Sequence, residues 1–195
     1  MRRISLAVFV LIVPFTLSAQ TTIFFEDFEG TGDEVYISDT NGLTGAPQWD
    51  YQNSIAGEGR LRMNAGVGFA RSGTKAATMD RVPGGAFQIN YLILNLDMSV
   101  YSASNPIYLS FFYMHHSEES HPNDSVWVRG SSADPWVGLY DLYANRATEG
   151  TYKNVTGQDI SSALGGAGQS FSSTFQIRFG QEDNYPATST TPTDG

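Results

Sequence analysis

Three acidic residues, Glu26, Asp27 and Glu29, lie within four positions near the start of the chain. Paired carboxylates are the catalytic groups of most glycosidases, and in retaining enzymes they stand about 5–5.5 Å apart. In a β-sandwich glycosidase such acids alternate along one face of an established sheet. Here they end a short apolar run that reads as a first strand and a turn, ahead of the main strands. This position disfavours acid–base catalysis.

The stronger strand patterns carry few further acids. Residues 91–98, 107–115 and 136–143 read as strands, and they contribute only Asp97 and Asp141. The chain has no cysteine and no Gly-x-Ser-x-Gly elbow, so nucleophilic catalysis has little support. The sequence therefore predicts a protein that is not an enzyme, with a hydrolase as the weaker alternative.

All three histidines lie within seven residues, at His115, His116 and His121, with Glu118 and Glu119 between them. A zinc site needs such ligands to converge on one point. Adjacent residues at a strand end face opposite sides, however, and the His-Glu-x-x-His spacing is absent. A solvated hairpin tip is favoured over a weak zinc site.

The three tryptophans, Trp49, Trp127 and Trp136, are candidates for stacking on sugar rings. Tryptophan combines a large flat apolar face with one polar group, which suits a wet binding surface. The alternation in residues 125–129 favours a core position for Trp127 instead. Core and ligand platform both stay open for each ring.

Short strands separated by turn residues predict an all-β fold, an antiparallel β-sandwich. Residues 107–115 are apolar on both faces, which is typical of a central strand. Residues 175–179 place three apolar side chains on one face and two polar ones on the other. The piece from Asp159 to Leu164 is expected to make one helical turn capped by Asp159.

The first nineteen residues have the pattern of a signal peptide. Arg2 and Arg3 precede an apolar stretch, and Ala19 offers a cleavage site. The mature chain would keep 9 basic and 20 acidic residues, a net charge of −11. That charge argues against nucleic acid as a partner. The sequence predicts an exported protein with no membrane span.

The order of several short motifs resembles the MAM-like branch of the concanavalin A-like jelly rolls, as found in exported proteins of Bacteroidetes-type bacteria. No single motif is specific, and the resemblance covers nearly the whole mature chain. The residues that carry it are Phe25–Glu29, Pro47, Trp49, Ala77–Asp80, Leu94–Asp97, Leu109–His115, Asn123–Val128, Trp136, Asp159–Ser161 and Phe175–Phe179.

The resemblance implies a single jelly-roll domain over residues 20–195. In that family the domain closes with a strand of the type Gly-aromatic-x-aromatic-Asp-Asp-Ile, which would begin at Asp194-Gly195, so the last strand is expected to be missing. An early acid in the family often holds a structural cation, and calcium prefers such oxygen ligands. The expected ligands here are Asp27 and Glu29, with Asp80 as a third.

The expected function is a non-catalytic extracellular recognition or adhesion module that binds a glycan or a protein within a larger secreted protein. The alternative is a secreted glycosidase or protease, or an accessory domain of one. A passive spacer has the same composition. Fold alone does not decide among these classes.

Overall fold

The computed structural model describes residues 21–63, 69–83, 85, 87–102, 104–115 and 121–183. The predicted signal peptide, residues 1–19, and the expected start of the missing strand at Asp194-Gly195 lie outside this part of the chain. The described residues form antiparallel sheets and one short helix, so the predicted all-β antiparallel class is confirmed. No helix among them is long and apolar enough to span a membrane.

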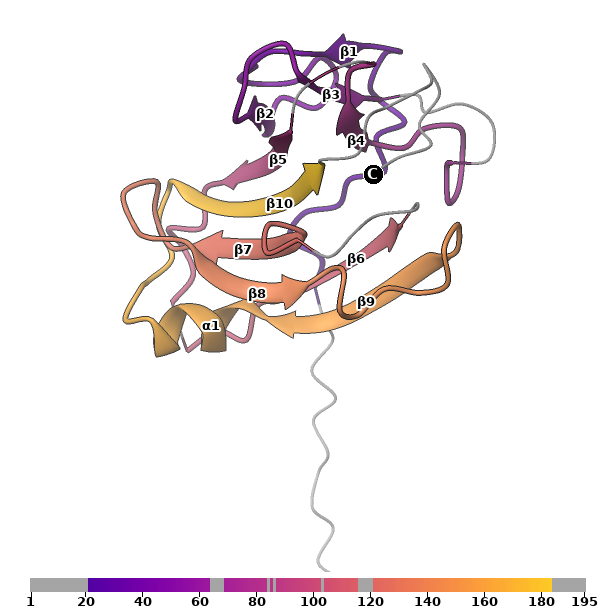
Figure 1. The fold of residues 1–195 in the computed structure, drawn as a ribbon. Coiled ribbons are helices and arrows are strands. Elements are labelled where there is room, and N and C mark those ends of the chain that lie inside the picture. The colour runs from indigo at the N-terminus through magenta and orange to yellow at the C-terminus, as the bar shows by residue number, and fades with distance from the viewer. Residues whose placement is uncertain are drawn as a thin grey trace, which may run out of the picture.

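The largest sheet has five strands in the order β2-β5-β10-β7-β8. β10 lies at its centre, paired with β5 over nine residues and with β7 over four. Figure 1 shows this sheet curving across the middle of the molecule. Its strands are β2 (Trp49–Asn53), β5 (Gln88–Leu96), β10 (Phe175–Asp183), β7 (Ser125–Arg129) and β8 (Val137–Asp141).

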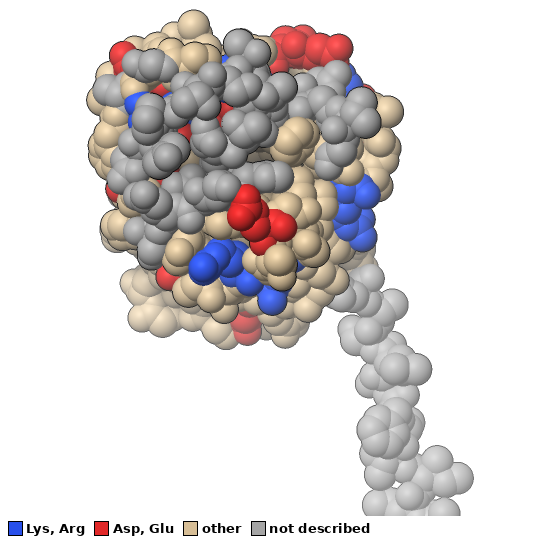
Figure 2. Space-filling view, turned by 45° about the vertical axis from the view of Figure 1, so that its right-hand side comes forward, with Lys and Arg blue, Asp and Glu red and all other residues tan. Residues whose placement is uncertain are grey.

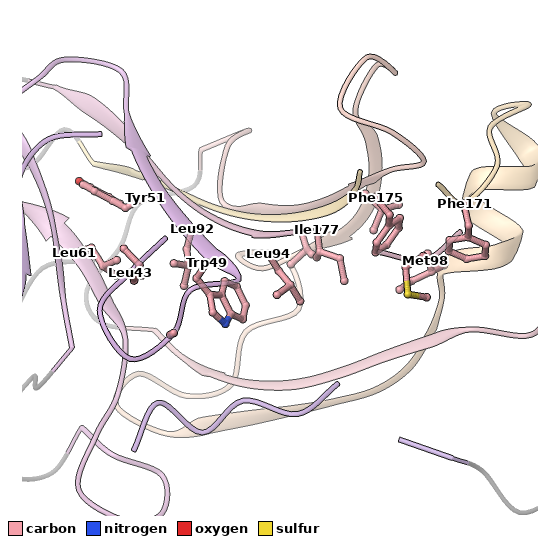
Figure 3. Close-up of a cluster of buried hydrophobic side chains, with 14 of the residues drawn as sticks. Leu43, Trp49, Tyr51, Leu61, Leu92, Leu94, Met98, Phe171, Phe175 and Ile177 are labelled. Atoms are coloured by element: carbon pink, nitrogen blue, oxygen red, sulfur yellow. The ribbon is translucent and has the colours of Figure 1, made fainter. Parts of the chain in front are cut away.

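A two-stranded sheet of β6 (Tyr108–Met114) and β9 (Tyr152–Asp159) lies on one side of the large sheet. The rings of Phe111 on β6 and Phe179 on β10 meet edge-to-face with centroids 5.2 Å apart. Between the layers lie buried side chains that include Trp49, Leu94 and Ile177 (Figure 3). Alternation along β10 points Phe175, Ile177 and Phe179 toward this core, as predicted.

The prediction that residues 107–115 form a central strand is wrong. β6 pairs only with β9 among the described strands, and Tyr108 and Phe112 are 46% and 42% exposed. Its apolar residues on both faces therefore reflect one core face and one partly exposed aromatic face. The central strand is β10 instead.

The expected first strand is also absent, because residues 21–34 contain none. The carboxylates turn the chain there: Glu26 accepts a hydrogen bond from the backbone N–H of Phe28 at 2.8 Å, and Asp27 accepts one from Glu29 at 3.1 Å. Such local bonds compete with strand pairing. Phe24 and Phe28 still pack on Trp49, so the segment closes one side of the core.

A small sheet of β1 (Val35–Tyr36), β3 (Gly59–Arg62) and β4 (Thr78–Arg81) lies at one end of the large sheet (Figure 1). Buried polar groups join the two. Asn90 on β5 accepts a hydrogen bond from the Tyr51 hydroxyl at 2.5 Å and donates to Gln181 at 2.7 Å and to the carbonyl of Asp80 at 3.1 Å. Because buried polar groups are costly unless bonded, this network fixes how the sheets meet.

The helix α1 (Ile160–Gly166) follows β9 directly. Asp159 caps it by accepting a hydrogen bond from the N–H of Ser162 at 2.9 Å, which confirms the predicted capped turn. Beyond the helix, Gln169 accepts from the N–H of Gly130 at 2.9 Å and donates to the carbonyl of Pro135 at 2.8 Å. This buried amide fixes the loop that leads into Trp136.

Candidate functional site

The outward face of the five-stranded sheet carries a group of aromatic and arginine side chains. Trp127 and Arg129 project from β7, Arg178 from the centre of β10, Tyr91 from β5, and Trp136 from the residue before β8. We call these five residues the arginine–aromatic platform. The core-facing neighbours Val126, Val128 and Ile177 are buried, so strand alternation assigns the platform residues to the opposite face.

Arg178 is the centre of the platform. Its Cζ atom lies 4.4 Å from the ring centroids of Tyr91 and Trp127 and 4.3 Å from that of Trp136. A guanidinium within about 6 Å of an aromatic face gains roughly 0.5–1 kcal/mol at exposed sites. Three rings around one cation therefore hold the Arg178 side chain in a defined position.

The ring positions follow from the register of the sheet. Arg178 pairs with Trp127 across β10 and β7, and Gly180 pairs with Tyr91 across β10 and β5. Since Gly180 has no side chain, the Tyr91 and Trp127 rings approach each other with centroids 6.3 Å apart, nearly edge-to-face. On the far side of Trp127, the opposing residue is Gly138, which leaves open space.

A chain of hydrogen bonds crosses four strands beside the stacked rings. Arg129 donates through Nε to Gln176 at 2.6 Å, Gln176 donates to Asn95 at 2.5 Å, and Asn95 donates to Asp50 at 2.8 Å. Arg129 also lies over the Trp136 ring, with its Cζ atom 4.3 Å from the centroid. These hydrogen bonds orient the Arg129 guanidinium through its Nε atom. Its Nη1 and Nη2 atoms have no protein hydrogen-bond partner in the described part of the chain.

Carboxylates do not neutralise the platform. Neither Arg129 nor Arg178 takes part in an ion pair among the described residues. Burial lowers the pKa of both guanidinium groups, and the charge of Arg129 lowers that of Arg178 further. Asp134 acts on Arg129 in the opposite direction from a longer range. Both groups stay charged at neutral pH, because arginine does not deprotonate in proteins.

The structure places the three tryptophans in two environments. Trp49 is a core residue, only 5% exposed. Trp127 and Trp136 are half-buried on the outward face, so the core position expected for Trp127 is wrong. Strand 125–129 alternates as predicted, but its core face consists of Val126 and Val128. No sequence pattern indicates that Arg178 contacts three aromatic rings.

The three expected metal ligands have different surroundings. Asp27 and Glu29 are exposed in the N-terminal turn. Glu29 accepts hydrogen bonds at 2.8 Å from the N–H groups of Thr74 and Lys75, which lower the pKa of its carboxyl. Asp80 is buried on β4, where its carboxylate binds Arg60 at 2.5 and 2.8 Å and Arg62 at 2.5 Å. In the described ranges, no group of three or more His, Asp or Glu side chains is arranged to hold a metal ion.

The other candidate acids are bound within their own turns, and the two described histidines contact nearby side chains. Asp97 accepts two bonds from Ser99, and Asp141 accepts one from the N–H of Ala144. His115 contacts the ring of Tyr143, and the Nδ1 atom of His121 lies 3.7 Å from Asp124. His116, Glu118 and Glu119 lie outside the described residues.

No family model, curated protein sequence or solved structure matches this chain. The site is therefore interpreted from its own chemistry. Figure 2 shows one face of the molecule, on which the described Lys and Arg residues form a few small groups, as the described Asp and Glu residues do. The platform combines three partly exposed aromatic rings with two cations that form no ion pair with an acid among the described residues.

Proposed function

We propose that this chain is a non-catalytic recognition module of an exported protein and that it binds carbohydrate on the arginine–aromatic platform. The observation that carries the proposal is the stack of Arg178 with Tyr91, Trp127 and Trp136 on the outward face of the large sheet. The resemblance to MAM-like jelly rolls and the predicted signal peptide are in keeping with an extracellular setting.

Carbohydrate suits this surface for two physical reasons. A pyranose presents a flat C–H face that packs on a partly exposed aromatic ring, and its hydroxyls pair with amide and guanidinium groups. Both kinds of group lie side by side here, because the row of Arg129, Gln176 and Asn95 runs next to the rings. Because the platform side chains come from strands of one sheet or from its border, few of them need to be reordered when a ligand binds, which limits the entropic cost of binding.

The surroundings of the acidic residues also favour a binding role over a hydrolytic role. The two acids on the expected strands, Asp97 and Asp141, are each engaged by backbone N–H groups of their own turns. The platform itself contains no carboxylate. It therefore offers groups that hold a ligand but no acid–base pair.

The test is a carbohydrate array probed with the wild-type domain and with Trp136→Ala. Trp136 precedes β8 and lies outside the strands, so its removal leaves the sheet pairing intact. We expect binding to at least one glycan, weakened at least tenfold by the substitution, which corresponds to about 1.4 kcal/mol. Tyr108→Ala, at an exposed tyrosine of β6, is the matched control and should bind like the wild type.

Two results would contradict the proposal. A broad array without any glycan bound would remove carbohydrate as the ligand class. Binding that survives Trp136→Ala and disappears in Tyr108→Ala would move the site to the opposite sheet. Circular dichroism melts of both variants show that any loss of binding does not come from unfolding.

A further inference from the structure

Two neighbouring cations without acidic partners are a specific feature of the platform. Arg129 and Arg178 each place Cζ 4.3 Å from the same Trp136 ring centroid, so the two Cζ atoms are no more than 8.6 Å apart. At this range the charge of Arg129 acts on Arg178. The chain has 20 acidic residues against 11 basic ones, yet none of the described acids forms an ion pair with either group. By contrast, Arg60 and Arg62 both form ion pairs with the carboxylate of Asp80.

The hydrogen-bond capacity of Arg178 is unused as well. Its Nε atom is buried without a partner, and no acceptor among the described residues bonds to its Nη atoms. Arg129 uses only Nε, in the bond to Gln176. Since a guanidinium has five N–H donors, the pair presents several unused donors beside the rings. An oxyanion bound there gains charge-assisted hydrogen bonds and relieves the repulsion between the two cations.

We propose that the glycan bound by the platform carries a carboxylate, as uronic and sialic acids do, and that Arg178 and Arg129 bind this group. This inference rests on the carbohydrate-binding function proposed above and adds the chemical class of the sugar. The planar carboxylate matches the fork of donors on arginine, which a neutral sugar does not.

The overall charge restricts the ligand to isolated acidic groups. The chain has a net charge of −9, which repels a dense polyanion at long range. Nucleic-acid binding typically uses six or more phosphate contacts, and the platform has two cations. One carboxylate between two arginines fits this balance, because the attraction acts at contact distance and the net charge is screened beyond about 8–10 Å.

The experiment compares each acidic sugar with a neutral counterpart on the same intact chain. The probes are galacturonate and glucuronate oligosaccharides beside their methyl esters, and sialyllactose beside lactose. Binding is followed by tryptophan fluorescence of the wild type, Arg178→Gln, Arg129→Gln and the control Arg146→Gln. Arg146 is an arginine that stacks on Tyr143, outside the platform.

We expect at least one acid to bind the wild type ten times or more tightly than its neutral counterpart, since hydrogen bonds between ionised groups are roughly twice as strong as those between neutral groups. Arg178→Gln or Arg129→Gln should bring that ratio close to one, because the acidic sugar loses its charge-assisted hydrogen bonds and therefore much more affinity than its neutral counterpart does. Arg146→Gln should keep the wild-type ratio. Raising the salt concentration should weaken only the acidic sugars.

The outcomes separate the two proposals. Equal binding of acid and neutral sugar overturns the carboxylate inference and leaves the carbohydrate-binding proposal standing. Failure of every acidic sugar to bind overturns the carboxylate inference alone, because the carbohydrate-binding proposal is decided by the glycan array. If a glutamate-rich peptide binds through Arg178 and the acidic sugars do not, the ligand is a protein and the inference is wrong. The wild-type comparison decides the case even if an arginine variant fails to fold.

Discussion

The ring of Trp127 on β7 lies against the backbone of Gly180 on the neighbouring strand β10. A Cβ atom at Gly180 would stand 2.6 Å from Cζ3 and 3.0 Å from Cη2 of the indole, and 2.6 Å from the carbonyl oxygen of Asn123. Carbon atoms do not approach so closely without displacement. The glycine therefore provides the space in which the Trp127 ring lies, and the position of Arg178 depends on that ring.

The first prediction follows from this contact. Gly180→Ala should displace Trp127 and lower the free energy of unfolding by about 1–3 kcal/mol, the usual cost of overpacking. It should also change the tryptophan fluorescence. Gly138→Ala is the matched control, because a Cβ atom at Gly138, on the other side of Trp127, meets nothing within 4 Å. Chemical denaturation of both variants measures the difference, and equal stabilities would show that the indole does not need the space above Gly180.

The second prediction concerns Asp80, which is 2% exposed and pairs with two buried arginines. Asp80→Asn removes the carboxylate charge that Arg60 and Arg62 share in the interior. Removing one partner of a buried ion pair typically costs about 3–5 kcal/mol. The pair of Lys75 with the exposed Asp33 provides the control: Asp33→Asn should cost less than about 1 kcal/mol, since water screens the Asp33 carboxylate. Urea melts test this, and a similar small loss in both variants would contradict it.

The third prediction is a pH dependence of stability from Asp124. Burial raises the pKa of its carboxyl from 3.8 to about 6, against the hydrogen bonds from the N–H groups of Glu182 and His121 and the charge of His121. A raised pKa means that the folded state binds the proton more tightly than the unfolded chain does. The stabilising contribution of this group is therefore complete below about pH 4 and is lost as the pH rises to 6.

Asp124→Asn removes this titration. The difference in melting temperature, wild type minus variant, should therefore fall between pH 4 and pH 6 and then level off. Asp97→Asn, at an exposed aspartate with a lowered pKa, should show no such fall in this range. A difference for Asp124→Asn that is constant across the range would mean that its carboxyl has an ordinary pKa.

The sequence predicts the elements whose signal is local. The alternation in residues 175–179 predicts the faces of β10, and Asp159 predicts the start of α1. β9 escapes prediction because Lys153, Asn154 and Gln158 make it polar and Val155 is its only buried residue. A strand with one exposed face and few apolar residues does not show the alternation on which prediction depends.

The platform could not be predicted for a different reason. Its contacts depend on register: Arg178 meets Trp127 because these residues pair across two strands that are some fifty positions apart in sequence. Pairing between distant strands leaves no mark in the local pattern of either one. The sequence favours a core position for Trp127 because tryptophans are highly buried on average. In the structure, Val126 and Val128 occupy the core face of β7, and Trp127 lies on the opposite face.

The fourth prediction tests the calcium expected from the MAM-like resemblance. Glu29 already holds Thr74 and Lys75 through their N–H groups, and Asp27 lies two residues away on the exposed side of the same turn. If a cation binds these oxygens, it stabilises the folded state by mass action, by about 2.7 kcal/mol at a hundredfold excess over the dissociation constant. The melting temperature should then be higher in calcium than in chelator.

Asp27→Asn should abolish this calcium-dependent shift and leave the melt in chelator unchanged, because the Asp27 carboxylate is exposed and its one hydrogen bond is local. Asp33→Asn, at another exposed acid near the N-terminus, is the control and should keep the shift. Asp80 is not expected to contribute, since both of its oxygens are bound by Arg60 and Arg62. Identical wild-type melts in calcium and in chelator would remove the cation from this turn, and the N-terminal segment would then be held by Glu29 and by the packing of Phe28 on Trp49.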